Sequence, residues 1–272
     1  MSMAFRLTRE TYYSPARPHV SMSQVKDYML SPRYYKRKYV DRDPELVFRV
    51  TDPMKRGMVV DELLTGEGVM RYKGKVLKSE DFSKYNEQKL EDPRFIVPKS
   101  YWEEALEIGG EVMRHPIWSW GIDGVARFQV ILTGKIGGLR VCGLADRIDD
   151  LGDKKYRLID LKVVSTAKIS SKEKWMFNCQ EMKYYHQLAL YQYLFCESRQ
   201  IPLGNVECCH VVGAYVQKGV VLVRGYRFGQ EILNKAFDEV VSSLRGIKER
   251  RFDEGVIGWR DADVINPKVY YE

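Results

Sequence analysis

The chain has 272 residues, of which 44% are hydrophobic and 12% aromatic, and it carries a formal net charge of +7. Apolar residues along the whole length exclude a disordered protein, and no apolar run approaches the ~20 residues that span a bilayer. The positive charge favours polyanionic partners such as nucleic acids.

The N-terminal region begins with a segment that has no clear periodicity. Residues 1–20 contain two prolines and are expected to form an N-terminal arm. Ser21 and Gln24 have the spacing of a capping box, with Ser23 as an alternative cap. The helix that follows should run to about Leu30.

Helical signals continue to residue 115. Ser31 as N-cap with Pro32 at the first helical position restarts a helix. Further helices are expected over 57–64 and 101–113, where apolar residues follow helical spacing. The stretch 65–98 mixes glycine, proline and charge, and looks like an insertion.

From residue 125 the pattern changes to strands. Strands expected over 125–132 and 139–148 flank a turn-rich connection, Thr133–Gly138, which is typical of a hairpin. A third strand is expected over 156–164. A long amphipathic helix over 175–196 should follow it.

The last third of the chain repeats the pattern of strands and then a helix. A second hairpin is expected from strands 206–216 and 220–226, followed by a charged helix over 232–250. This order predicts an α/β fold, with a central mixed β-sheet flanked by helices. We expect one domain after the arm, divided as follows: a helical lead-in, 21–115; a core, 116–250; and a C-terminal tail, 251–272.

Cysteine and histidine give no sign of a metal or disulfide framework. The five cysteines are odd in number and contain no C-x-x-C, and the four histidines have no metal-ligand spacing. The first residues lack the apolar region of a signal peptide. We therefore expect reduced thiols in a cytoplasmic protein with no membrane partner.

The third strand carries an acid and a lysine among apolar residues. Side chains alternate along a strand, so Asp160 and Lys162 should share one face, roughly 7 Å apart, while Ile159 and Leu161 face the other way. Four acid-x-Lys triplets occur in the chain, but only this one lies in an apolar strand. Buried charges of this kind need a partner or a ligand.

A second acid, Asp146, closes the preceding strand. If strands 139–148 and 156–164 pair through the polar turn between them, Asp146 and Asp160 can lie side by side. Two adjacent carboxylates repel unless a cation joins them, and hard oxygen ligands favour Mg²⁺ or Mn²⁺. Such an ion would activate a water, with Lys162 orienting it or stabilising the transition state. The alternative is an exposed Asp146 and a plain Asp160–Lys162 ion pair.

A basic, tyrosine-rich segment offers contacts to DNA. Cations can meet phosphates and tyrosine rings can stack on bases, so this segment is a candidate DNA-binding surface. The residues concerned are Arg33, Tyr35, Lys36, Arg37 and Lys38. The alternative is a solvated helix face with its tyrosines in the core.

These residues resemble the core of the PD-(D/E)XK nucleases. Asp146 and Asp160-Leu161-Lys162 match the motif of that superfamily, and Gln187 with Tyr191 resembles the Gln-x-x-x-Tyr pair of its RecB-like branch. Gln187 and Tyr191 are i, i+4 neighbours on one helix face. The resemblance implies a restriction-endonuclease-like core. It also implies catalytic roles for Asp146, Asp160, Lys162, Gln187 and Tyr191, and metal ligation by the two aspartates and the Leu161 backbone carbonyl.

The N-terminal half resembles exonuclease VIII (RecE-type) enzymes. Ser21-x-Ser23, the segment 31–36 and the segment 54–64 carry this likeness, as does 162–167 after the motif lysine. The resemblance implies a phage-type recombination and repair exonuclease that degrades one strand of duplex DNA from an end in a bacterial or phage-infected cell. It also implies a ring-shaped homo-oligomer and a single-strand annealing protein as partner.

Two positions depart from the family pattern. Asp61 stands where the family normally has a histidine, so we expect it as a substitute metal ligand. The first core strand offers Ala126–Gln129 where the family tends to place a glutamate. These departures motivate a second reading as a non-catalytic DNA-binding recombination accessory protein.

A third reading is a nuclease similar to the CRISPR adaptation exonucleases, acting on single-stranded DNA or flaps. Those enzymes usually hold an iron–sulfur cluster with one cysteine near the position of Ser31 and three near the C-terminus. Ser31 is not a cysteine and none follows Cys209. We therefore expect no iron–sulfur cluster.

Overall fold

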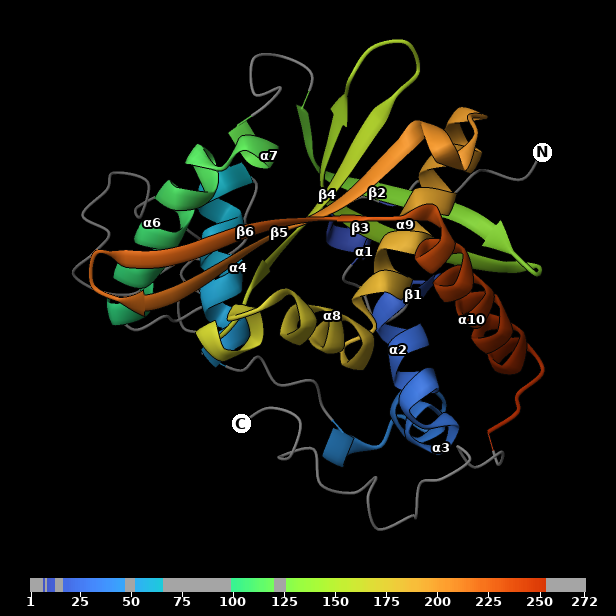
Figure 1. The fold of residues 1–272 in the computed structure, drawn as a ribbon. Coiled ribbons are helices and arrows are strands. Elements are labelled where there is room, and N and C mark those ends of the chain that lie inside the picture. The colour runs from blue at the N-terminus through green and yellow to red at the C-terminus, as the bar shows by residue number, and fades with distance from the viewer. Residues whose placement is uncertain are drawn as a thin grey trace.

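Six strands form one mixed sheet with helices packed on both of its faces (Figure 1). The computed structural model describes residues 7, 9–12, 17–46, 52–65, 99–119 and 126–252. This architecture confirms the expected α/β fold class. The expected insertion over 65–98 falls almost entirely outside the described residues, as does most of the expected tail.

The N-terminal elements begin where the sequence places their caps. Ser21 is the N-cap of α2, and its backbone N–H donates to Gln24 Oε1 over 2.8 Å as in a capping box. Ser31 caps α3 by accepting a hydrogen bond from the Tyr34 N–H. The elements are α1 (Arg9–Tyr12), β1 (Val20–Ser21), α2 (Met22–Leu30), α3 (Pro32–Tyr35), η1 (Lys36–Val40) and η2 (Pro44–Leu46).

Part of the expected N-terminal arm packs against the sheet. Leu7 and Tyr12 are buried in a small apolar cluster with Cys142, which belongs to β3 (Leu139–Asp150). Val20 and Ser21 pair with β3 in parallel. The arm is therefore anchored at these points, which the lack of periodicity did not predict.

The first hairpin is longer than expected. β2 (Ala126–Ile136) continues through Thr133, where the sequence predicted the turn to begin, and pairs with β3 as far as Ile136. The turn is Gly137-Gly138, with φ angles of 57° and 85°. Two consecutive positive φ values are those of the tight turns that match strand twist, and glycine adopts them without a steric cost.

The centre of the sheet is built from strands of both directions. β4 (Tyr156–Val163) runs antiparallel to β3 and parallel to β5 (Val206–Gln217). β6 (Val220–Phe228) closes the second hairpin beside β5. β3 pairs with β4 only at its C-terminal end and with β1 near its start, so it changes partners along its length.

The helix expected over 175–196 is two helices. α8 (Lys172–Glu181) ends, and α9 (Tyr184–Arg199) begins after Lys183, which has a left-handed φ of 56°. Lysine rarely adopts this conformation, so the apolar pattern alone did not predict the break. The remaining elements are η5 (Thr166–Ile169), η6 (Leu203–Asn205) and α10 (Gln230–Lys248).

Two apolar cores lie on opposite faces of the sheet. The larger one joins the sheet to α2, α8, α9 and α10, and includes Leu158 of β4. The smaller one joins it to α4 (Asp52–Thr65), α6 (Lys99–Arg114) and α7 (Pro116–Ser119). Ile159 and Leu161 belong to the smaller core, so successive β4 side chains alternate between the two faces as expected.

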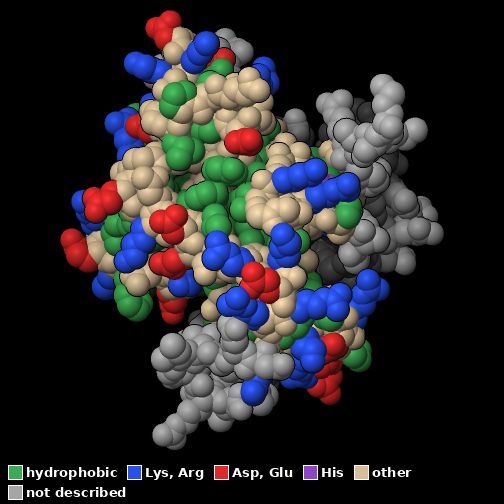
Figure 2. Space-filling view, turned by 90° about the vertical axis from the view of Figure 1, so that its right-hand side faces the viewer, with side chains coloured by type: hydrophobic (Ala, Val, Ile, Leu, Met, Phe, Trp, Pro, Cys, Tyr) green, Lys and Arg blue, Asp and Glu red, His purple; other side chains and the backbone are tan. Residues whose placement is uncertain are grey.

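The surface is charged, and the thiols are inside. In the view of Figure 2, Lys and Arg side chains gather over the lower part of the face, interspersed with Asp and Glu. All five cysteines are buried and unbridged. Among the described residues, no helix combines the length and apolar character needed to cross a bilayer.

A buried ion pair lies within β3, and its arginine, Arg147, also donates a hydrogen bond to the Trp118 carbonyl of α7. Arg147 Nε lies 2.6 Å from Asp149 Oδ1, and both side chains are fully buried. Removing the Asp149 carboxylate takes a buried counter-charge away from the Arg147 guanidinium. We therefore expect Asp149→Ala to lower the free energy of unfolding by about 3–5 kcal/mol in urea titrations.

Arg227→Ala is the matched control for this experiment. Arg227 Nε lies 2.8 Å from Glu207 Oε1, but its side chain is 62% exposed. Its loss should cost only about 0–1 kcal/mol. Equal effects of the two substitutions would contradict the prediction.

Candidate active site

The candidate site lies where β3 and β4 separate. Their pairing runs from Asp150↔Tyr156 to Arg147↔Ile159 and stops there. Asp146 and Asp160 are the next two residues in that register. The Asp146 carboxylate accepts a hydrogen bond from the Leu161 N–H, with Oδ2 2.7 Å from the nitrogen. The Asp146 side chain thus replaces a backbone hydrogen bond between the two strands. Asp146 and Asp160 are close enough for their charges to interact, as expected.

Asp160 is fully buried and surrounded by three polar side chains. Lys162 Nζ lies 2.5 Å from Oδ2, and His210 Nε2 lies 3.3 Å from the same oxygen. Gln187 Nε2 donates to Oδ1 over 2.7 Å. The expected Asp160–Lys162 proximity on one strand face is therefore present, and the Gln187 contact joins it.

Opposite charges keep the Asp160–Lys162 pair ionised. Burial opposes the charged form of Asp160, but Lys162 and His210 outweigh it and hold the pKa of that carboxyl below its usual range. Burial likewise opposes the charge on Lys162, while Asp160 and Asp146 raise the pKa of its ammonium above its usual value. The site therefore holds a permanent negative and a permanent positive charge side by side.

Asp146 has the opposite tendency. Burial raises its pKa well above the usual value, and the neighbouring charges of Asp160 and Asp61 raise it further. Like charges in a low-dielectric environment disfavour each other's ionised forms. A cation bound beside Asp146 would therefore favour the ionised form of this carboxyl.

Asp61 reaches the site from α4, which packs on the sheet beside β4. Both of its carboxylate oxygens accept hydrogen bonds from Gln129 Nε2, each over 2.8 Å. Gln129 lies opposite Asp146 in the β2–β3 register, but at φ 50° it takes no part in the ladder. The β2 position that faces Asp146 is thus filled by a neutral amide. Metal ligation by Asp61 stays a prediction.

Gln187 and Tyr191 join α9 to the two separated strands. Gln187 holds Asp160 on β4, and Tyr191 shares a hydrogen bond with the backbone of Leu144 on β3. The Tyr191 ring packs on Gly143, where an added Cβ would meet a ring carbon at 2.3 Å. Tyr191 is buried, and its contacts with Gly143 and Leu144 fix α9 against β3.

Lys26 of α2 is a site residue that the motifs did not reveal. Its Nζ donates to Gln187 Oε1 over 2.8 Å and lies 5.0 Å from the centre of the Tyr184 ring. Burial, together with the charge of Lys162, lowers its pKa to about 7. Its isolated position in an ordinary helix gave no sequence signal.

His210 was also missed. β4 and β5 place it directly beside Asp160, and it is completely buried. Its ring packs edge-on against Trp175, Tyr184 and Phe228. A histidine in an otherwise apolar strand was the available signal.

The imidazole of His210 is held in one protonation state. Burial lowers the pKa of His210, which favours the neutral ring. Its Nδ1 lies 3.8 Å from the Cys179 sulfur. Burial raises the pKa of this thiol, so its proton is available to Nδ1. The Nε2 proton can then point at Asp160.

The donor set fits a hard divalent cation. Asp160 Oδ2 is buried between Lys162 and His210, and the charges of Asp160 and Asp61 both act on the carboxyl of Asp146, so three hard oxygen donors lie in one region. Within the described ranges, no three acidic, histidine or cysteine side chains are already arranged as a ligand cluster. Asp160 and Asp146 would hold the ion, with Lys162 beside Asp160. The Leu161 carbonyl stays a predicted ligand.

The basic segment lies partly in the core. Tyr35 is buried and packs on Tyr28 and Phe252, so its ring is not available to DNA. This corrects the expectation for Tyr35 and agrees with the alternative of a tyrosine in the core.

The cations of this segment are partly paired. Lys38 Nζ lies 2.8 Å from Asp27 Oδ2, and Arg37 Nη2 lies 2.5 Å from Asp43 Oδ2. Arg33 and Arg37 are exposed, and Lys36 is partly exposed. DNA contacts by Arg33, Lys36, Arg37 and Lys38 stay a prediction.

Comparisons with known proteins bear on the family and the fold. A model of the PD-(D/E)XK nuclease superfamily matches residues 19–253. A crystal structure from Eubacterium rectale, named "Putative exonuclease", covers 94% of this chain and 92% of its own, with 17% sequence identity and a TM-score of 0.65. At this identity the likeness shows a shared fold.

Other comparisons add little. The crystal structure of SSO0001 covers 80% of this chain and 85% of its own, with 13% identity and a TM-score of 0.29, and carries no argument. No curated protein matches the sequence.

Lys26 should make stability depend on pH. Its folded-state pKa of about 7 lies below the unfolded value of 10.5, so the unfolded chain binds more protons between these values and wild-type stability rises with pH there. Lys26→Met should therefore be more stable than wild type at about pH 6, and this advantage should shrink toward about pH 9. Urea unfolding at both pH values measures it.

Lys172→Met, at an exposed position of α8, is the control. Its stability difference from wild type should be the same at both pH values. A Lys26→Met difference that stays constant with pH would contradict the assignment.

Proposed function

Since the chain belongs to the PD-(D/E)XK nuclease superfamily, we propose that it is a metal-dependent deoxyribonuclease that hydrolyses phosphodiester bonds. The observation that carries this proposal is the separation of β3 and β4, which brings Asp146, Asp160 and Lys162 together. Nucleases of this superfamily generally use divalent metal ions. We propose Mg²⁺ or Mn²⁺, because the donors are hard carboxylate oxygens.

Each side chain has a defined role in this proposal. Asp146 and Asp160 hold the ion, which when bound lowers the pKa of a water and polarises the phosphoryl oxygens. Lys162, whose ammonium lies beside Asp160, would orient the attacking water or stabilise the charge on the phosphorus oxygens. Gln187 keeps one Asp160 oxygen fixed, and Lys26 in turn donates a hydrogen bond to Gln187 Oε1.

We further propose that the enzyme is an exonuclease acting on ends of linear duplex DNA, in the manner of RecE-type recombination enzymes. The shared fold with the Eubacterium rectale protein named "Putative exonuclease" supports this, as does the net charge of +7. A ring-shaped homo-oligomer and a single-strand annealing partner belong to the same proposal and stay predictions.

A second candidate is a DNA-binding accessory protein without catalysis. The direct Asp160–Lys162 contact and the neutral Gln129 facing Asp146 favour it, because a site whose charges are already balanced needs no ion. Binding would then persist without hydrolysis.

The first test is nucleotide release from end-labelled linear duplex DNA with Mg²⁺, Mn²⁺ or EDTA. Wild-type protein should release nucleotides only with metal. Asp160→Asn and Lys162→Met should each slow release by at least about 100-fold, since each removes a charge that acts on the reacting phosphate. Circular duplex DNA should resist, because it has no ends.

Asp150→Asn is the matched control, since Asp150 is an exposed acid at the end of β3. It should keep wild-type activity. Tight DNA binding by wild-type protein with no release under any metal would refute the nuclease and support the accessory protein.

His210 should act as a positioning residue for Asp160. His210→Phe removes the group that faces Asp160 Oδ2, so the carboxylate loses its orientation. We expect the Mn²⁺ concentration for half-maximal activity to rise about 10- to 100-fold, with the rate at saturating Mn²⁺ largely retained. His210→Gln, whose amide can donate near the position of Nε2, should restore most of the affinity.

His186→Gln controls for the loss of a buried histidine. His186 is also buried, and its Nε2 lies 2.8 Å from Glu239 Oε2 on α10. It should leave the Mn²⁺ dependence unchanged. The positioning role is wrong if His210→Phe and His186→Gln behave alike.

A further inference from the structure

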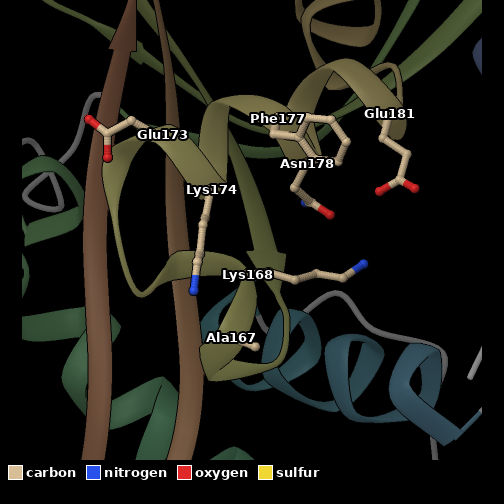
Figure 3. A pocket seen from close by; sticks show the side chains of 7 residues that line it. All are labelled: Ala167, Lys168, Glu173, Lys174, Phe177, Asn178 and Glu181. Atoms are coloured by element: carbon tan, nitrogen blue, oxygen red, sulfur yellow. The ribbon is translucent and has the colours of Figure 1, made fainter.

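A pocket of about 430 Å³ opens beside α8, outside the set of residues assigned to hydrolysis. Figure 3 shows side chains from α8 and from η5 facing each other across it. Its lining combines an aromatic ring, an amide and charged groups: Phe177, Asn178, Lys168, Lys174, Glu173 and Glu181.

Asn178 is the feature that marks this pocket as a binding site. Its side chain is 3% exposed, and neither its Oδ1 nor its Nδ2 has a hydrogen-bond partner. In Figure 3 the amide extends from α8 toward Lys168. A buried amide without partners is unfavourable, and a ligand that offers both a donor and an acceptor would relieve it.

Phe177 supplies a flat apolar surface next to this amide. It is 70% exposed, which is unusual for an aromatic side chain on a helix that otherwise packs against the core. An exposed ring beside a hydrogen-bonding amide fits a nucleobase, whose face stacks and whose edge carries donors and acceptors.

The charges around the pocket indicate how such a ligand would lie. Glu173 and Glu181 disfavour a phosphate inside the pocket, while the exposed ammonium groups of Lys168 and Lys174 can meet phosphates at its rim. A neutral base would therefore occupy the pocket, and the sugar–phosphate backbone of the strand would lie at the rim.

The pocket is joined to the candidate active site through two side chains. Cys179, the neighbour of Asn178 on α8, lies with its sulfur 3.8 Å from His210, and His210 lies 3.3 Å from Asp160. Lys168 follows Lys162 along the chain after β4 ends. α8 therefore borders both the pocket and the group of residues around Asp160.

We propose that this pocket binds one unpaired base of the DNA strand at the active site, with Phe177 stacking on the base and Asn178 bonding to its edge. The inference rests on the proposed nuclease function and adds to it a subsite for single-stranded DNA. Only an unpaired nucleotide can place its base there, because a base inside a duplex is already stacked and paired.

The test is binding without hydrolysis. Fluorescently labelled single strands, each with one abasic site moved along the sequence, are titrated with protein in EDTA. One abasic position should weaken wild-type binding by about 5-fold or more, the loss expected for one base–aromatic stack. Phe177→Ala should weaken binding of the intact strand by a similar factor and lose sensitivity at that position.

Further variants separate the contributions. Phe177→Trp should keep the abasic profile, because the larger ring still stacks. Asn178→Ala should reduce discrimination between bases at the sensitive position. Met113→Ala changes a residue of α6 that is 50% exposed, and should bind every strand as wild type does.

Two results would overturn the subsite: no sensitive abasic position, or equal sensitivity in Phe177→Ala. Unchanged DNA affinity in Phe177→Ala would assign this surface to a different kind of partner and also reject the proposal. Failure of the nuclease itself is recognised separately, as wild-type protein that shows the abasic profile in EDTA and releases no nucleotide with metal. Phe177 is exposed, so these outcomes do not depend on a variant that fails to fold.

Discussion

The candidate site depends on one local constraint, the parting of β3 from β4 after the Arg147↔Ile159 pair. Continued pairing would fill the space between Asp146 and Asp160 with backbone hydrogen bonds. Instead, the Asp146 carboxylate accepts the Leu161 N–H, and the start of β3 pairs with β1. Backbone groups on both strands therefore find other hydrogen-bond partners where β3 and β4 separate, which lowers the cost of the separation.

Around that opening the chain balances an unusual density of buried charge. Three acidic groups from different elements, Asp61, Asp146 and Asp160, lie near one another, and the amines of Lys162 and Lys26 lie near Asp160. Neutral donors complete the set: Gln187 and His210 serve Asp160, and Gln129 serves Asp61. Such an array contributes little to stability, because desolvation offsets the attraction. Its functional consequence is that a bound cation would favour the ionised form of Asp146, whose pKa is raised in its absence.

Local sequence patterns predicted what depends on neighbours along the chain. The alternation of β4 placed Asp160 and Lys162 on one face and Ile159 on the other, and the Ser21 and Ser31 caps began their helices as expected. Patterns failed where tertiary packing decides. Lys183 breaks a continuous apolar period with a left-handed residue, and Tyr35 turns inward. His210, Lys26 and Gln129 reach the site through pairing and packing between distant segments, which no local motif encodes.

The contacts that α9 and β5 make with Asp160 through Gln187 and His210 also bear on the order in which the site forms during folding. The β3–β4 hairpin is a local structure, but Gln187 is 27 residues further along the chain and His210 lies beyond it. Contacts at larger sequence separation form later, because more chain entropy is lost in closing them. A chain emerging from the ribosome therefore presents its two acids before it has the groups that orient them. The site is assembled only when nearly the whole domain has been synthesised, so an incomplete product carries the motif without its geometry.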